Sequence, residues 1–164
     1  MMGRMGMYGT FQRVTPAELA RAIADPRATF KAFDPRAEGE AADRLFHLDK
    51  AWHGVQYLLD SAGVDLDAVF YANVFDGFGD DLPMGSYLRP GEVAAAAEVL
   101  SAVPPEALAA QYDADALQEA DVYPGIWARE GDAGCAWLTS HYEGLDQYLA
   151  AAAKDGDAVL FWVW

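Results

Sequence analysis

The sequence predicts an α+β fold in a single compact domain, mostly helical, with a small sheet that includes the N-terminal segment and the C-terminal strand. The chain ends in an apolar run of high strand propensity, residues 158–164. Residues 5–13 are also rich in apolar and aromatic side chains, and they precede a helix start. Prolines and capping residues mark a series of helices between these two strands, with no repeat, linker or low-complexity tract.

Short elements fill the first half of the chain. Thr15 is placed to cap a helix over residues 17–24, and Glu18 completes a capping box. That helix stops at Asp25, before a proline that opens the next one. The expected elements that follow are a short helix over 26–33, a polar loop over 34–44, a helix from Leu48 to about Gly63, a strand over 69–75 and a loop over 76–83.

Helices dominate the second half. Residues 90–102 form an alanine-rich segment of high helix propensity. The longest helix is expected over 133–154, where apolar side chains recur at spacings of three and four, so its apolar face should be central to the core. Residues 121–127 interrupt the helices with a turn, which we expect to lead into a short strand. Two further short helices are expected over 105–111 and 113–120.

Composition places the chain among globular proteins. Its 164 residues are 53% hydrophobic and 13% aromatic, enough to bury a core in one domain. No apolar run is long enough to span a membrane. The first residues lack the apolar centre of a signal peptide, and the single cysteine cannot form an internal disulfide. We therefore expect a cytoplasmic protein.

Negative charge is concentrated in the later part of the sequence. The net charge is −15; residues 1–50 carry eight basic and seven acidic side chains, and residues 51–164 carry 3 and 19. Such a surface repels phosphate backbones, so we expect no nucleic-acid partner. A basic protein partner fits this charge. The plainer interpretation is that the charge keeps the protein soluble and monomeric.

The predicted helix that begins at Leu48 separates its apolar and polar residues cleanly. Asp49, His53 and Tyr57 are spaced one turn apart on its polar face, where their side chains could meet. A carboxylate beside an imidazole can fix the tautomer of the ring, as ligand binding or acid–base chemistry requires. An ordinary solvated face is the alternative. Gly54, in the middle of this helix, indicates close approach by another element.

Aromatic residues from separate segments could form a pocket beside this polar face. Core packing is the alternative for each of them. The side chains that the sequence proposes for binding are Asp49, Lys50, Trp52, His53, Tyr57, Tyr87, Tyr123 and Trp127.

Motifs for catalysis, cofactors and metals are weak, so we expect a non-catalytic protein with no cofactor and no bound metal. The glycines of Gly77-Phe78-Gly79 lack the third glycine of a phosphate-binding loop. Zinc sites need clustered Cys and His, but His47 lies at the edge of the predicted helix and Cys135 has no basic neighbour. Cys135 is expected to be an inert, buried thiol.

Several ordered motifs together resemble one family. They are Met5-Gly6-Met7-Tyr8-Gly9, Asp49-Lys50-Ala51-Trp52-His53-Gly54, Tyr87-Leu88, Glu92-Val93, Tyr123-Pro124-Gly125-Ile126-Trp127 and the aromatic last helix and strand. The chain resembles the YfbM-like family, known as domain of unknown function 1877. The resemblance implies a small bacterial, cytoplasmic α+β protein of one domain over residues 5–164, after a disordered extension over 1–4, and it supplies no activity.

Two functional hypotheses follow. The first is a non-catalytic acidic module that binds another protein, with a basic one preferred. The alternative is a small-molecule-binding domain or enzyme with its site around Asp49, His53 and Tyr57. The oligomeric state stays open under both, and the apolar C-terminal strand could pair across a dimer.

Overall fold

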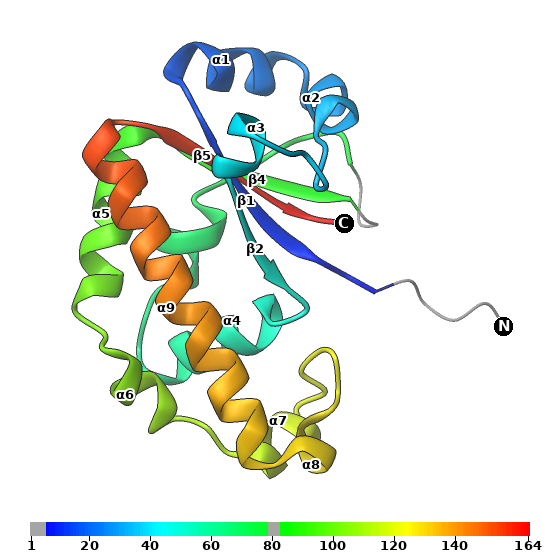
Figure 1. Ribbon diagram of the computed structural model, residues 1–164, viewed down its shortest axis with the longest axis vertical. Helices are drawn as coiled ribbons and strands as arrows, with labels where there is room; N and C mark the ends of the chain where they lie inside the picture. The colour runs from blue at the N-terminus through cyan, green and yellow to red at the C-terminus, as the bar shows by residue number, and fades with distance from the viewer. Residues whose placement is uncertain (1–5, 79–82) are drawn as a thin grey trace, which may run out of the picture.

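The first and last strands of the chain pair with each other at the centre of the sheet. The computed structural model describes residues 6–78 and 83–164, and Figure 1 shows its elements in chain order. Within this part of the chain, five antiparallel strands run in the order β2-β1-β5-β4-β3. Their bounds are β1 Gly9–Val14, β2 Leu45–Asp49, β3 Asn73–Val74, β4 Met84–Leu88 and β5 Ala158–Val163.

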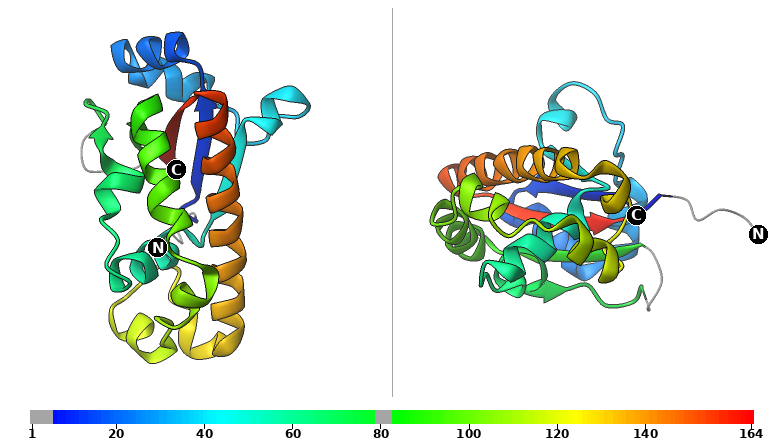
Figure 2. Two further views of the ribbon diagram at one scale, coloured as in Figure 1. Left: turned by 90° about the vertical axis from the view of Figure 1, so that its left-hand side faces the viewer. Right: turned by 90° about the horizontal axis from the view of Figure 1, so that it is seen from below.

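The main hydrophobic core lies between one face of the sheet and three helices. These are α4 (Trp52–Ser61), α5 (Pro90–Ser101) and the long α9 (Asp132–Asp155). Figure 2 shows α5 and α9 side by side next to the strands, and α4 also packs against α9. Phe11 of β1 and Phe161 of β5 point into this core, with their ring centroids 4.6 Å apart. Burial of these apolar side chains supplies most of the driving force for the fold.

A smaller aromatic cluster lies on the opposite face of the sheet. Helices α1 (Pro16–Ala24) and α2 (Pro26–Ala32) pack there, at the upper end of the molecule in Figure 1. The fully buried Trp162 is its centre, and Phe75 stacks on it with ring centroids 5.4 Å apart. The capping box predicted at the start of α1 is present, because Thr15 and Glu18 each accept a hydrogen bond from the other's backbone N–H.

Short helices fill the end of the molecule farthest from α1 and α2. They are α6 (Pro105–Ala109), α7 (Ala114–Glu119) and α8 (Trp127–Glu130), and Figure 1 shows them at its lower end. Tyr142 of α9 anchors the α5–α6 connection, since its hydroxyl donates to the carbonyls of Leu100 and Val103. Burial raises the pKa of Tyr142 to about 12.

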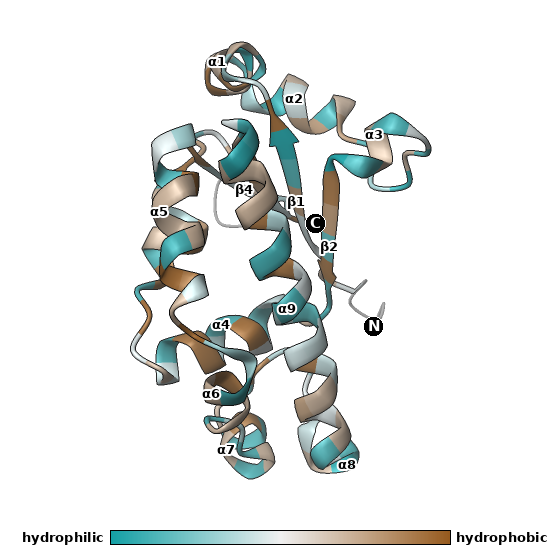
Figure 3. Ribbon diagram, turned by 60° about the vertical axis from the view of Figure 1, so that its left-hand side comes forward, coloured by the Kyte–Doolittle hydropathy of each residue, from teal (hydrophilic) through white to brown (hydrophobic). Residues whose placement is uncertain are grey.

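The predicted α+β class, with both terminal segments in the sheet, is confirmed. One correction concerns residues 45–49, which form β2, so that helix α4 begins at Trp52 and not at Leu48. Phe46 and Leu48, two residues apart, point to the same face of the sheet, where Phe46 contacts α9 and Leu48 is part of the main core. This spacing is the period of a strand. Figure 3 shows apolar stretches, in brown, on both β2 and α4. The predicted helix merged this strand with α4.

Three other segments differ from their predicted structure. Val69 and Phe70 are adjacent and both buried, which the π-helical turn Asp67–Tyr71 allows and a strand with one buried face does not. The turn after residue 121 leads into helix α8, whose Ala128 N–H donates to the Gln118 side chain, and not into a strand. The loop over 34–44 contains the short helix α3 (Glu40–Asp43).

The central position of β5 excludes one of our expectations. Both of its edges are used, by β1 and by β4, so it cannot pair across a dimer as we had allowed. The proposed extension over residues 1–4 and part of the loop over 76–83 lie outside the described residues. None of the helices in the described part of the chain is long and apolar enough to cross a membrane.

Candidate functional site

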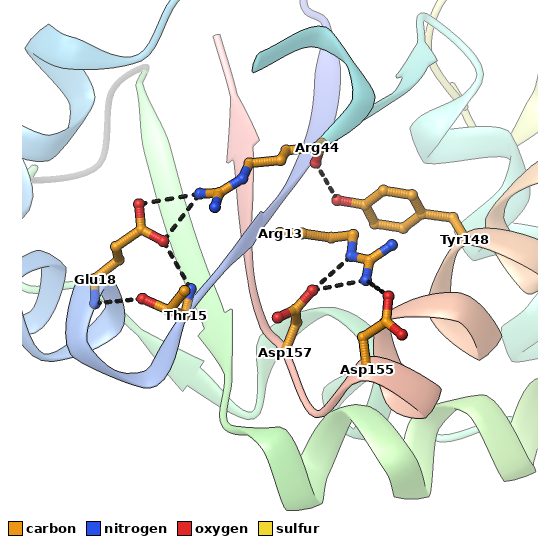
Figure 4. A network of polar contacts seen from close by, with 7 residues as sticks. All are labelled: Arg13, Thr15, Glu18, Arg44, Tyr148, Asp155 and Asp157. Atoms are coloured by element: carbon orange, nitrogen blue, oxygen red, sulfur yellow. Dashed lines mark hydrogen bonds and ion pairs between the residues drawn. The ribbon is translucent and has the colours of Figure 1, made fainter. Parts of the chain in front are cut away.

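Polar side chains at one end of the sheet, where β1 finishes and β5 begins, bind one another. Arg13 donates to Asp155 at 2.5 Å and to Asp157, whose carboxylate lies 2.7 Å from the same guanidinium nitrogen (Figure 4). Burial lowers the pKa of Arg13, but the hydrogen bonds to Asp155 and Asp157 outweigh it, and the net shift is upward.

A second set of contacts continues this network. Glu18 accepts two hydrogen bonds from Arg44, at 2.9 and 3.1 Å, and the Tyr148 hydroxyl donates to the Arg44 carbonyl (Figure 4). The hydrogen bond from the Thr15 backbone N–H is the main reason that the pKa of Glu18 is lowered. We call this the paired end of the sheet, formed by Arg13, Glu18, Arg44, Tyr148, Asp155 and Asp157. Its charged groups satisfy one another, so its role is structural.

The opposite end, where β1 begins and β2 and β5 finish, has two hollows of about 320 Å³ each. We call it the open end. The adjacent residues Met7 and Tyr8 line one hollow each. The His53 hollow is lined by Met7, Trp52, His53, Asp121, Tyr123, Pro124 and Gly125. The His47 hollow is lined by Tyr8, Pro35, Arg36, His47, Asp49 and Trp164.

His53 has a defined protonation state. Its Nδ1 lies 2.9 Å from the backbone nitrogen of Tyr123, and a backbone N–H can only donate, so Nδ1 is the unprotonated nitrogen. The ring stacks on Trp52, with centroids 5.2 Å apart and planes 23° apart. Burial lowers the pKa of His53. The imidazole is therefore neutral at neutral pH, and its Nε2–H remains as a hydrogen-bond donor.

Two hydrogen bonds hold the walls of the His53 hollow together. The Tyr123 hydroxyl accepts from the Met7 backbone N–H at 2.8 Å, and the Trp52 indole N–H donates to the Met7 carbonyl at 3.1 Å. The Tyr123–Pro124 peptide bond is cis. Elements distant in sequence are thus fixed around this hollow before any ligand arrives, which lowers the entropy cost of binding.

Each hollow also contains an aspartate in a left-handed backbone conformation. Asp49 has φ 51° and Asp121 has φ 55°, and they are the only residues other than glycine with positive φ in the described chain. Asp tolerates this region better than most residues, but it is still sparsely populated. Backbone conformations of this kind gather at functional sites, so the pair marks the open end as a candidate.

The proposed binding residues separate into three groups. Trp52, His53 and Tyr123 lie together in the His53 hollow. Asp49 lines the His47 hollow, where the Lys50 ammonium lies 5.7 Å from the centroid of the Tyr8 ring. The remaining three lie elsewhere: Tyr57 packs at the margin of the main core, Tyr87 packs on Phe75 on the other face of the sheet, and Trp127 is fully buried in the core.

The predicted row of Asp49, His53 and Tyr57 on one helix face is wrong. Asp49 is the last residue of β2, and its left-handed conformation turns the chain before α4 begins. Its carboxylate lies 3.9 Å from Nε2 of His141 on α9. His53 therefore does not pair with the carboxylate predicted on its own helix; its Nδ1 accepts a hydrogen bond from the Tyr123 backbone N–H instead.

Four lining residues of the His53 hollow were not proposed from the sequence: Met7, Asp121, Pro124 and Gly125. Asp121, Pro124 and Gly125 were recognised as a turn, and only their nearness to His53 makes them part of a site. The interpretation of Gly54 is confirmed, since a Cβ there would lie 2.7 Å from Leu138 of α9 and 2.9 Å from Trp127.

Two features of the described residues concern metal and thiol chemistry. No group of three or more His, Cys, Asp or Glu side chains in the described residues is arranged to hold a metal ion. Cys135 is half-buried, not fully buried as predicted. Burial, with a smaller effect from Asp132, raises the pKa of its thiol, which makes it less reactive.

Fold and sequence define a small α+β protein with two hollows at one end of its sheet. The chain belongs to the DUF1877 family, described as a domain of unknown function, whose model matches residues 5–162. It is similar to the crystal structure of YfbM, a protein of unknown function from Escherichia coli, with a TM-score of 0.69 and 18% identity. The match covers 96% of this chain and 99% of that one, and it shows the shared fold. No curated protein matches the sequence significantly.

Proposed function

We propose that the protein is a non-catalytic binding domain that recognises a basic segment of another protein at the His53 hollow. The observation that carries this proposal is a hollow with aromatic walls, a neutral imidazole donor and a carboxylate at its rim. Binding domains use such preformed hollows to accept one side chain of a partner.

Charge around the hollow supports a basic partner. The segment from α6 to the start of α9 has a single basic side chain, Arg129, which pairs with Glu130 at 3.0 Å. Summed charge of one sign attracts partners of the opposite sign and speeds their association. The acidic residues of this segment are Glu106, Asp113, Asp115, Glu119, Asp121, Glu130 and Asp132.

The lining groups match the chemistry of a basic peptide. Exposed Asp121 can accept hydrogen bonds from a guanidinium or ammonium group. The Tyr123 and Trp52 rings, with centroids 6.3 Å apart, offer aromatic surface to the aliphatic stem of Lys or Arg, or to the cation itself. The Nε2–H of His53 can donate to a peptide carbonyl.

The same groups favour binding over catalysis. None of the residues that line the His53 hollow carries an aliphatic hydroxyl or a thiol that could act as a nucleophile. Nδ1 of His53 is already engaged by the Tyr123 backbone. A small molecule is the second candidate ligand, because about 320 Å³ is within the range of small-molecule sites.

An array of short peptides that contain Arg or Lys tests the first function. Binding is measured by NMR shifts of the His53 and Trp52 ring signals, with Gln-containing peptides as neutral controls. We expect Asp121→Asn to weaken binding about fivefold, equivalent to ~1 kcal/mol. Asn keeps the left-handed backbone of this position. Glu38→Gln, an exposed change of equal charge in the loop before α3, should leave the affinity unchanged.

Equal losses in the Asp121→Asn and Glu38→Gln variants would mean that the peptides respond only to overall charge, and the proposal would then fail. A thermal-shift screen with small metabolites distinguishes the second candidate. A stabilising metabolite whose effect is lost in His53→Ala, together with no peptide binding, would replace the protein partner by a small molecule.

A further inference from the structure

We propose that the His47 hollow is a second binding site, which takes an anionic aromatic molecule: a carboxylate attached to a planar ring. This inference is independent of the function proposed for the His53 hollow. It depends on an aromatic platform, an imidazole held in one tautomer, and basic side chains that form no ion pair in the described part of the chain.

The platform consists of Tyr8 and Trp164. Their ring centroids lie 5.0 Å apart, and their backbones exchange two hydrogen bonds of 2.8 and 2.9 Å that extend the pairing of β1 with β5. Phe33, which follows α2, packs against Trp164 edge to face at 6.2 Å. Both platform rings are half-buried, so they are fixed in place and still present surface to the hollow. Such surfaces stack favourably on planar ligands.

A fully buried hydroxyl sets the tautomer of His47. The Trp164 indole N–H donates to Thr10 Oγ1 at 3.1 Å, and an indole N–H can only donate. A buried hydroxyl places its own proton on an acceptor, and Nδ1 of His47 lies 3.1 Å away. Nδ1 therefore accepts, and the neutral ring carries its proton on Nε2. The platform and the imidazole are one connected unit.

The basic side chains at this hollow form no close ion pair within the described residues. Within the described residues, Arg36 and Lys50 have no carboxylate within 4.0 Å, although the cations of the paired end do. Arg36 lines the hollow, and Lys50 lies over the Tyr8 ring. Two cationic groups, Arg36 in the lining and Lys50 beside it, thus accompany the single lining carboxylate of Asp49 on a protein with a net charge of −15. Guanidinium groups bind carboxylates through paired hydrogen bonds.

Asp49 is the acidic residue among the lining side chains, and it selects the orientation of the ligand. Its carboxylate lies 3.9 Å from His141 Nε2, and it repels a second carboxylate. The ligand's carboxylate is thus directed toward Arg36 and the His47 Nε2–H, with its ring on the Tyr8–Trp164 platform.

Titration with benzoate, followed through the Trp164 indole and His47 ring signals in NMR spectra, tests the site. We expect benzoate to shift these signals, and acetate and benzylamine to bind at least about tenfold more weakly, because each lacks one of the two recognised features. Arg36→Gln should weaken benzoate binding about fivefold. Arg21→Gln on α1, an exposed change of equal charge, and His53→Ala in the other hollow should leave benzoate binding unchanged.

Three outcomes would overturn the inference: no shift of the Trp164 and His47 signals, equal binding of acetate and benzoate, or equal weakening by Arg36→Gln and Arg21→Gln. Failure of the basic peptides to bind the His53 hollow would leave this site standing, since the two hollows have separate linings.

Discussion

The two ends of the same strands use similar side chains in opposite ways. At the paired end, Arg13 and Arg44 form ion pairs with carboxylates of the protein itself. At the open end, Arg36 has no such partner in the described chain, and His47 and His53 each use Nδ1 internally. Polar groups that satisfy one another stabilise a fold, whereas groups satisfied on one side only remain available to a ligand. The two ends therefore differ in how many hydrogen bonds and ion pairs their polar side chains already make within the protein.

Arg13→Met gives the largest expected effect and tests the structural role of the paired end. The substitution keeps an apolar stem but removes the hydrogen bonds to Asp155 and Asp157. We expect the free energy of unfolding to fall by about 2 kcal/mol, the range of hydrogen bonds to charged groups after allowance for the exposure of Asp155. Urea unfolding measures it, and adding Asp155→Asn and Asp157→Asn should recover part of the loss.

Benzoate and peptide binding should be unchanged in Arg13→Met when it is measured on folded protein. A loss of ligand binding without a loss of stability would reverse the roles that we assign to the two ends.

Thr10→Val is expected to have a smaller effect and tests whether the open end is internally connected. Valine has nearly the same shape as threonine but offers no hydroxyl to Trp164 or His47. The free energy of unfolding should fall by about 1 kcal/mol, because the indole N–H of the half-buried Trp164 loses its acceptor. The NMR signals of the His47 ring nitrogens should also change, since its tautomer is no longer fixed.

Thr29→Val on α2 is the matched control, because the Thr29 hydroxyl contacts only the exposed Asp25 carbonyl. An equal loss of stability in both variants, with the His47 ring signals unchanged, would show that Thr10 does not set the His47 tautomer.

The smallest expected effect is a pH dependence that distinguishes the two ends. Burial lowers the pKa of His53, so the unfolded chain binds a proton more readily than the folded one. The contribution of His53 to the free energy of unfolding should be complete above pH 6.5, the ordinary pKa of histidine. It should decline as the pH falls from there to the lowered pKa of the folded state. His53→Gln should remove this decline, as shown by the difference between its unfolding free energies and those of the wild type across pH.

Glu18 at the paired end titrates in a different range. Its pKa is lowered, so its stabilising contribution is full above pH 4.5 and is lost as the pH falls through the folded value. Glu18→Gln should therefore alter only the more acidic part of the curve. A change in the same pH window for both variants would contradict this separation.

Local signals predicted the parts of the fold that depend on neighbouring residues. Thr15 and Glu18 mark a helix start because both partners of the capping box lie within one turn. The run that forms β5 was recognised by its strand propensity. The strand β2 was not, because Leu48 precedes Trp52 by four residues and so fits a helical face as well as its own strand.

The candidate site was only partly predictable for the same reason. His53, Trp52 and Tyr123 were proposed as chemically suitable side chains, but 70 positions separate His53 from its partner Tyr123. Asp121 lies beside His53 only because the turn that follows α7 brings it to this hollow. Single-sequence patterns carry no signal for such distant contacts, whereas the structure supplies them directly.

The central position of β5 also has a consequence for biosynthesis. Residues 158–163 lie between β1 and β4, and β1 pairs with a segment that is made almost 150 residues later. Until that segment leaves the ribosome, β1 and β4 have no shared neighbour, and each keeps one unpaired edge. We therefore expect slow folding, typical of chains with many distant contacts, and dependence on chaperones during translation.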